Sequence, residues 1–177
     1  MDTGARSPLD VVAAIGLAVG GAFGMAGTFV PQAALRQELW AIDGVAIVVA
    51  TALLTVKFGR QGRDCVAAGF LVFLAGETLL LAGNAAGLEA SVPTYGGGVA
   101  LWTASLLMTS IPSTFAAWTR LVGVVGAVLF AVTAALIAWG EPLLPTSAPL
   151  PTLGYPFLVL TFVGWIWRLL KPPAGSL

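Results

Sequence analysis

The stretch CVAAGFLVFLAGETLLLAGNAAG, residues 65–87, decides the fold class of this chain. It is apolar except at a few positions such as Glu77 and Asn84, and about 20 apolar residues in a helix cross the hydrocarbon core of a bilayer. Five further runs of this kind recur along the chain. We therefore expect an all-α polytopic membrane protein, a single domain over residues 1–177 that forms a bundle of six transmembrane helices. The expected spans are 11–30, 39–56, 65–87, 96–115, 121–139 and 153–170.

The composition agrees with this class. Hydrophobic residues make up 58% of the chain and charged residues 9%, whereas soluble domains have roughly 45–50% and about 25%. Little sequence remains for a separate extramembrane domain, so the expected surroundings are the lipid bilayer. The formal net charge of zero gives no reason to expect a nucleic-acid partner.

The distribution of lysine and arginine predicts the orientation, because short cytoplasmic loops retain positive charge during insertion. With the N-terminus inside, only Arg36 falls in an outer loop. The first run is too long for a signal peptide and has no basic excess before it, so we expect a retained helix. The prediction is a bacterial-type inner (plasma) membrane protein with both termini cytoplasmic. The basic residues on the inner side are Arg6, Lys57, Arg60, Arg63, Arg120, Arg168 and Lys171.

The sequence lacks the residues that several kinds of active site require. The chain has no histidine and one cysteine, Cys65, which removes the usual haem and zinc ligands and the commonest general base. Nucleophile-elbow, zinc-protease and phosphate-loop motifs are absent. Asp43-Gly44 matches only the opening of the membrane phosphatidyltransferase signature, without its later aspartates. We expect no cofactor and no metal, and enzymatic activity is less expected than its absence.

Glu77 is the strongest candidate for a functional residue. It lies near the centre of the third run, where a charged side chain costs at least about 2.5–3.5 kcal/mol, so acids there often mark pathways or paired sites. Asn84 follows seven residues later on nearly the same helical face. The fourth run offers a facing wall with hydroxyls at four-residue spacing, Ser105, Thr109 and Ser113. These five residues form the candidate intramembrane polar site.

The same residues also have a purely structural interpretation. Neutral polar side chains in membranes often hydrogen-bond between helices and contribute roughly 0.6 kcal/mol each. For Glu77 and Asn84, this structural interpretation and a functional one are about equally favoured. For the serine and threonine stripe, packing is the favoured interpretation.

Two further features concern helix contacts. Gly16, Gly20 and Gly24 recur at four-residue spacing in the first run, and small residues on one stripe let two helix backbones approach closely. We expect this glycine stripe to pack within the chain, with a homo-oligomer as the alternative. Arg36 and Asp43 are expected to form an outer ion pair, either as a helix anchor or as a gate.

Aromatic residues cluster near the expected ends of the spans. Tryptophan and tyrosine favour the headgroup level of a bilayer, so an interfacial belt is preferred over an aromatic ligand cage. The outer group is Trp40, Tyr95, Trp102, Trp139 and Tyr155, and the inner group is Trp118, Trp165 and Trp167.

Two functions fit these patterns. The first is a non-catalytic membrane subunit, sensor, or lipid- or partner-binding bundle, which the short loops and absent motifs favour. The alternative is a small proton- or cation-linked transporter or channel that uses Glu77 at the membrane midplane. A water-accessible cavity beside Glu77 would favour transport, whereas sealed hydrogen bonds would favour packing.

Overall fold

The computed structural model describes residues 7–171 and, within them, consists of six α-helices. Arg6 and both ends of the chain lie outside the described residues. The connections between helices contain Pro31, Gly62, Gly87 and Gly140, and the last three have positive φ angles that favour glycine. The helices are α1 (Pro8–Phe29), α2 (Ala33–Arg60), α3 (Asp64–Ala86), α4 (Val92–Ser110), α5 (Ala117–Ala138) and α6 (Gly154–Leu170).

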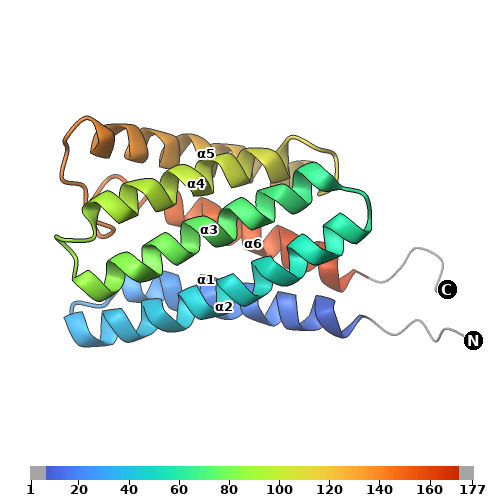
Figure 1. Cartoon of the computed structure of the whole chain (residues 1–177), viewed down its shortest axis with the longest axis horizontal. Coiled ribbons are helices and arrows are strands. Elements are labelled where there is room, and N and C mark those ends of the chain that lie inside the picture. Colours follow the sequence, from blue (N-terminus) through green and yellow to red (C-terminus); the bar gives the residue numbers. More distant parts are fainter. Residues whose placement is uncertain (1–6, 172–177) are drawn as a thin grey trace, which may run out of the picture.

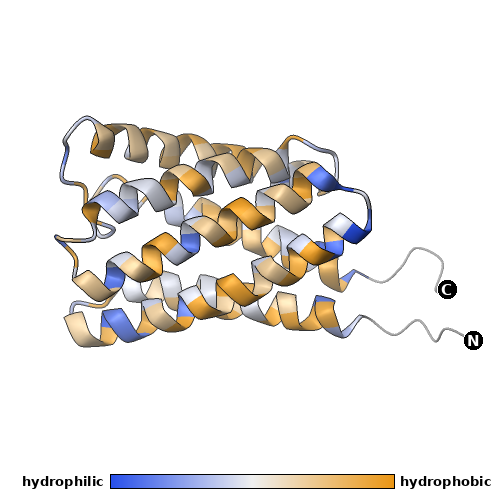
Figure 2. Cartoon of the chain, in the orientation of Figure 1, coloured by the Kyte–Doolittle hydropathy of each residue, from blue (hydrophilic) through white to orange (hydrophobic). Residues whose placement is uncertain are grey.

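Four of the described helices, α1, α2, α3 and α5, are long and apolar enough to cross a membrane. Helix α6 is apolar but has 17 residues, and α4 has 19 residues with a more polar sequence. Large apolar side chains such as Val45 and Val128 lie exposed on the outer surface, and Figure 2 shows apolar residues along the middle of the bundle. These features indicate a membrane protein.

The helices form a closed ring in chain order (Figure 1). Each helix packs antiparallel against its sequence neighbours, and α6 returns to pack against α1. No other pair of the six described helices makes backbone contact. Side chains from all six therefore point into one shared interior.

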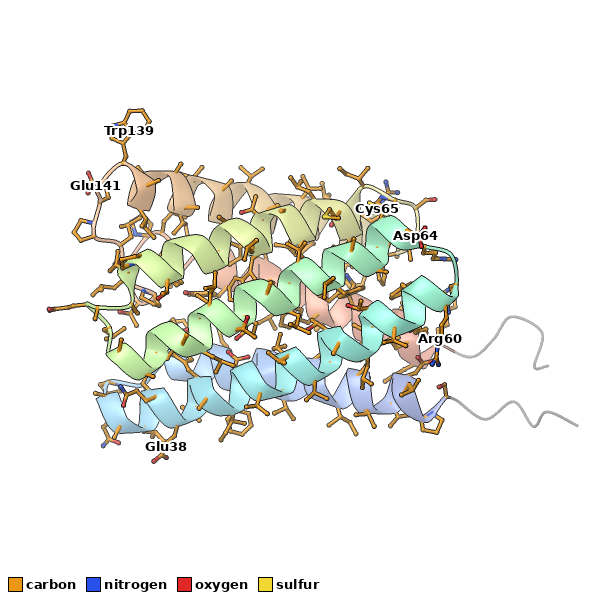
Figure 3. The ribbon with its side chains drawn as sticks, viewed as in Figure 1. Glu38, Arg60, Asp64, Cys65, Trp139 and Glu141 are labelled. Atoms are coloured by element: carbon orange, nitrogen blue, oxygen red, sulfur yellow. The ribbon has the colours of Figure 1, made fainter. Side chains whose placement is uncertain are left out.

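The two ends of the ring differ in charge. We call the end where α1 begins and α6 ends the basic end, and the opposite one the far end. Figure 3 shows Arg60, Asp64 and Cys65 at the basic end and Glu38 and Glu141 at the far end. Among residues 7–171, Arg36 is the one lysine or arginine at the far end, and the basic end holds Lys57, Arg60, Arg63, Arg120, Arg168 and Lys171.

The interior of the basic half is filled with aromatic rings. Phe58 stacks on Phe70 with centroids 5.5 Å apart, and Phe70 meets Trp165 edge-on at 4.8 Å. Phe115, from the α4–α5 connection, packs against all three. We call Phe58, Phe70, Phe115 and Trp165 the aromatic cluster; its members are between 0% and 6% exposed, so this half is tightly packed.

The second and fourth spans differ most from their expected bounds: α2 covers Ala33–Arg60, where the sequence predicts a helix over residues 39–56. The sequence predicts a helix over residues 96–115, whereas α4 covers Val92–Ser110. Pro112 explains the early end, because it has no backbone N–H with which to continue the helical hydrogen bonds. Residues 111–116 form the connection that places Phe115 in the interior.

Candidate functional site

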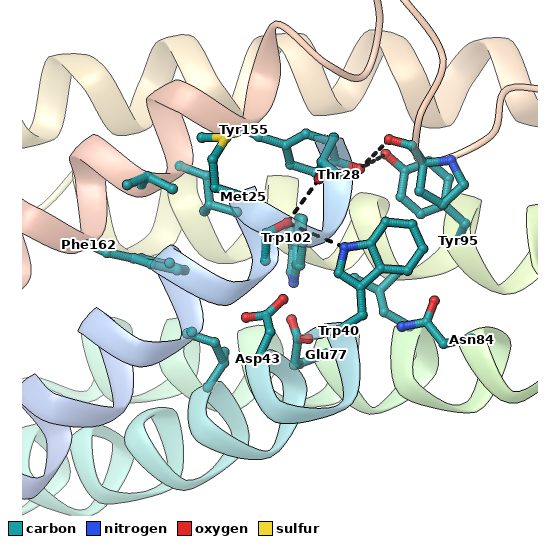
Figure 4. A pocket seen from close by; sticks show the side chains of 18 residues that line it. Met25, Thr28, Trp40, Asp43, Glu77, Asn84, Tyr95, Trp102, Tyr155 and Phe162 are labelled. Carbon is teal, nitrogen blue, oxygen red and sulfur yellow. Dashed lines mark hydrogen bonds between the residues drawn. The ribbon is translucent and has the colours of Figure 1, made fainter. Parts of the chain in front are cut away.

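The interior of the far half contains a cavity of about 60 Å³. It is lined by residues of α1, α2, α3, α4 and α6 and by Pro145 of the α5–α6 connection (Figure 4). At this size it has room for a few water molecules or one small ligand. The polar and aromatic side chains around it are Thr28, Trp40, Asp43, Glu77, Asn84, Tyr95, Trp102, Tyr155 and Phe162.

Asp43 reaches the cavity because α1 carries glycine where α2 crosses it. A Cβ atom at Gly24 would lie 2.5 Å from Asp43 Oδ2, and one at Gly20 would lie 3.1 Å from Oδ1. The aspartate therefore occupies space that side chains on α1 would otherwise fill. The third member of the glycine stripe, Gly16, lies nearer the basic end, where a Cβ would come within 2.8 Å of the Ala46 backbone oxygen. The stripe thus faces α2 of the same chain.

Glu77 enters the cavity from α3 and is 4% exposed. At its neighbour Gly76 the two helices come close together, since a Cβ there would lie 2.9 Å from the Gly98 backbone oxygen of α4 and 3.0 Å from Trp102 Cδ1. This approach brings the Trp102 indole beside Glu77. Figure 4 shows the carboxyl groups of Asp43 and Glu77 pointing in the same direction, with the Trp102 nitrogen above them.

The two carboxyl groups have no protein partner. No hydrogen bond or ion pair joins Asp43 or Glu77 to another residue in the range 7–171. Within that range they are also the only charged residues more than two turns from both ends of their helices. A buried charge normally has a partner, so these groups are suited to hold a proton or a cation.

Trp102 adds a second unpartnered polar group. Its side chain is 6% exposed, and its Nε1–H donor has no hydrogen-bond acceptor among the described residues. The ring is fixed from behind by stacking on Phe73, with centroids 5.3 Å apart and planes 17° from parallel, and by the edge of Phe130. The donor is thereby held toward the carboxyl groups.

Two tyrosines close the side of the cavity toward the far end. The Tyr95 and Tyr155 hydroxyls are 2.8 Å apart, and Tyr155 donates to the Pro145 carbonyl at 3.0 Å. Since Tyr155 uses its proton on Pro145, Tyr95 is the donor to Tyr155. This chain of hydrogen bonds ties α4, α6 and the α5–α6 connection together above the cavity.

Trp40 and Asn84 separate the cavity from a second hollow. Both residues line the cavity and also an outer groove of about 220 Å³ between α2 and α3, whose other walls include Arg36, Gln37 and Leu88. The Trp40 indole donates to the Gly24 carbonyl at 3.3 Å, which holds it across the gap between α1 and α2. Only these two residues line both the cavity and the groove.

The structure brings together only part of the predicted polar site. Glu77 and Asn84 line the cavity. Ser105 and Thr109 are buried against Gly69 of α3, nearer the basic end, and Thr109 donates to the Ser105 carbonyl of its own helix at 2.9 Å. Ser113 is exposed in the α4–α5 connection, beyond the end of α4. The expected track of fourth-helix hydroxyls therefore does not face Glu77.

The expected ion pair between Arg36 and Asp43 does not form. Seven residues of helix separate them by about 10 Å along the axis. Arg36 instead donates to the Val30 carbonyl at 2.7 Å and lies over the Trp40 ring, 5.9 Å from its centre. The free carbonyls at the end of α1 attract the cation, so Asp43 is left for the cavity.

The expectation of an aromatic belt is wrong for most of the outer group. Trp139 is 91% exposed at the far end, but Trp40, Tyr95 and Trp102 are less than 10% exposed and line the cavity together with Tyr155. The missed signal is spacing, because Trp40 precedes Asp43 by one turn and so shares its helical face.

No protein-family model, curated protein or solved structure matches this chain.

Proposed function

We propose that this protein is a small proton- or cation-linked membrane transporter in which Asp43 and Glu77 hold the transported ion or the coupling proton. The observation that carries the proposal is the pairing of two acidic side chains, from adjacent helices, in one interior cavity without protein partners. Keeping two such groups inside an apolar bundle is costly. A structural contact would have saturated them with hydrogen bonds.

The proposal includes a six-span topology with the basic end in the cytoplasm of a bacterial-type plasma membrane. Six of the seven described lysines and arginines lie at the basic end, as expected for cytoplasmic loops. Helices of 19 and 17 residues, α4 and α6, are about 28 and 26 Å long, close to the roughly 30 Å of a bilayer core. The cavity would then lie in the outer half of the membrane.

Single cysteines test the topology. In a Cys65→Ser background, Gln61→Cys places a thiol in the α2–α3 connection and Glu89→Cys places one in the α3–α4 connection. An impermeant maleimide added to intact cells should label Glu89→Cys, and should label Gln61→Cys only after permeabilisation. Equal labelling of both from outside would overturn the proposed orientation.

Transport is tested in reconstituted vesicles that contain a pH-sensitive dye. A gradient of Na⁺, K⁺ or choline is imposed, one cation at a time, and ion-coupled proton movement is recorded. We expect movement with the wild type and its loss in Glu77→Gln and in Asp43→Asn. Glu38→Gln is the matched control, because Glu38 is an exposed acid at the far end of α2.

Two results would contradict the proposal. One is a wild-type protein that moves no proton and no cation under any gradient. The other is Glu77→Gln vesicles that behave like the wild type in both flux and cation binding. Either result would favour a non-catalytic subunit, sensor, or lipid- or partner-binding bundle, in which Glu77 is an element of packing.

A further inference from the structure

The cavity selects positive charge. Among its lining residues, Asp43 and Glu77 are the only carboxylic acids, and none is lysine or arginine. Arg36, the nearest cation along α2, is held over the Trp40 ring by the Val30 carbonyl and does not line the cavity. A ligand that brings a positive charge would give the two carboxylates the partner that the protein does not supply.

The walls do not suit a small, hard metal ion. Ca²⁺ takes six to eight oxygen ligands and Mg²⁺ six in strict geometry. Apart from the two carboxyl groups, the side-chain oxygens of the lining are neutral ones, those of Thr28, Asn84, Tyr95 and Tyr155, and the two tyrosine hydroxyls are tied to each other and to Pro145. No group of three or more acidic, cysteine or histidine side chains arranged for a metal occurs in residues 7–171.

The walls do suit an ion whose charge is covered by carbon and hydrogen. Trp40, Trp102, Tyr95 and Tyr155 make up much of the surface, and Leu80, Leu158 and Phe162 supply much of the rest. Aromatic rings attract ammonium groups, best of all methylated ones that shed water readily. A cavity of about 60 Å³ is far smaller than the ~300–1,000 Å³ of drug-sized sites, so the ligand must be compact.

The Trp102 N–H is a further feature that suits a bound cation. Its Nε1–H is buried, lacks an acceptor and points toward the carboxyl groups. When a cation occupies the cavity, both carboxylates are ionised, and an indole N–H directed at one of them stabilises its charge. The unpartnered donor is thus explained by the occupied state.

We infer that the ligand of this cavity is a small organic ammonium ion, held by the carboxylates of Asp43 and Glu77 within a wall of aromatic side chains. This inference rests on the proposed transport function and specifies its substrate class. Binding should depend on the positive charge of the ligand, on both acids and on the Trp102 N–H.

The test is calorimetric titration of the purified full-length chain in detergent. The probes are methylammonium, which is small enough for the cavity, its neutral counterpart methanol, NaCl and MgCl₂. Methylammonium should bind saturably, and methanol at least about 10-fold more weakly, because it leaves the buried carboxylates unpaired. Glu77→Gln and Asp43→Asn should weaken methylammonium binding at least as much, and Trp102→Phe should weaken it about 10-fold through loss of a hydrogen bond to a charged group. Glu38→Gln should bind like the wild type.

The outcomes separate this inference from the proposed function. Equal affinity for methylammonium and methanol would overturn the inference. So would binding of Na⁺ or Mg²⁺, dependent on Glu77, with no binding of methylammonium; in that case vesicle transport dependent on Glu77 would still support the proposed function. Methylammonium binding that survives Glu77→Gln and Asp43→Asn would place the ammonium site elsewhere.

Discussion

The basic half and the far half of the ring both enclose aromatic side chains, but they use them differently. In the basic half, the aromatic cluster of Phe58, Phe70, Phe115 and Trp165 packs ring against ring. In the far half, the aromatic side chains are tryptophans and tyrosines that surround a cavity with two acids. One half is built for stability, and the other places polar groups where they cost stability.

This contrast also means that the cavity is closed more firmly toward one end of the ring than toward the other. Toward the basic end the aromatic cluster fills the interior, and Phe73 links it to Trp102 at the cavity. Toward the far end the barriers are the hydrogen-bonded pair of Tyr95 and Tyr155 and the side chains of Trp40 and Asn84 beside the outer groove. The proposed ligand would therefore meet less obstruction from the far end, and passage to the basic end would require the aromatic cluster to move.

The largest expected effect comes from opening the aromatic cluster. Trp165→Ala should lower the free energy of unfolding by about 3–5 kcal/mol, because it leaves a large void among packed rings. The measurement is reversible unfolding in mixed micelles. Trp167→Ala, which changes a 66% exposed residue on the same helix, should have little effect. A loss below about 1 kcal/mol for Trp165→Ala would mean that the basic half is loosely packed.

The next largest effect is expected from the hydrogen bonds that join Tyr95, Tyr155 and Pro145 near the far end. Tyr155→Phe removes the hydrogen bonds to Tyr95 and Pro145 and should cost about 1–3 kcal/mol in the same unfolding assay. Tyr95→Phe is the matched control, since it removes only the bond between the hydroxyls and should cost about half as much. Equal losses for both variants would show that the Pro145 contact contributes nothing to stability.

Glu77→Gln should leave stability unchanged or raise it by up to about 1 kcal/mol, because a buried carboxyl without a partner stabilises nothing. The same variant is expected to lose cation-coupled transport, so stability and activity should separate. Asp10→Asn, which breaks the ion pair with Lys57 at the basic end, should instead cost a small amount of stability and leave transport intact. A marked destabilisation by Glu77→Gln would identify this residue as a packing contact.

The smallest effect is expected on α4 below the cavity. Ser105 is fully buried, and its hydroxyl has no partner among residues 7–171. Ser105→Ala should change the free energy of unfolding by less than about 0.5 kcal/mol, since removal of an unsatisfied hydroxyl is close to neutral. Transport should be unaffected. Loss of transport in Ser105→Ala would instead show that the fourth-helix hydroxyls belong to the transport path.

Several features follow from the sequence because they depend on one helix at a time. Hydropathy predicts the positions of all six helices, although α2 (Ala33–Arg60) extends beyond the expected 39–56 at both ends and α4 ends early near Pro112. The position of Glu77 in an apolar run marks it without any knowledge of its neighbours. Glycines at four-residue spacing indicate a close helix contact in the same way.

The rest depends on how each helix is rotated in the ring. Nothing local tells whether Asp43 faces Arg36, lipid or α1, and only the packing against Gly20 and Gly24 turns it into the cavity. Tyr95 and Tyr155 lie near the starts of α4 and α6, where an aromatic side chain is equally suited to the membrane interface and to the interior. The contact between α1 and α6, which closes the ring, decides in favour of the interior role.

The closed ring in chain order also has a consequence for biogenesis. Because each helix contacts its predecessor, the first five can pair one after another as they leave the ribosome, with no rearrangement of earlier contacts. Until α6 arrives, however, α1 has a bare flank, and the two acids are open to lipid on that side. Helix α6 supplies Tyr155, Leu158 and Phe162 to the cavity, so the cavity is complete only once α6 has joined the ring. Quality-control proteases that survey the membrane would meet an exposed acidic flank in any chain that stalls before that step.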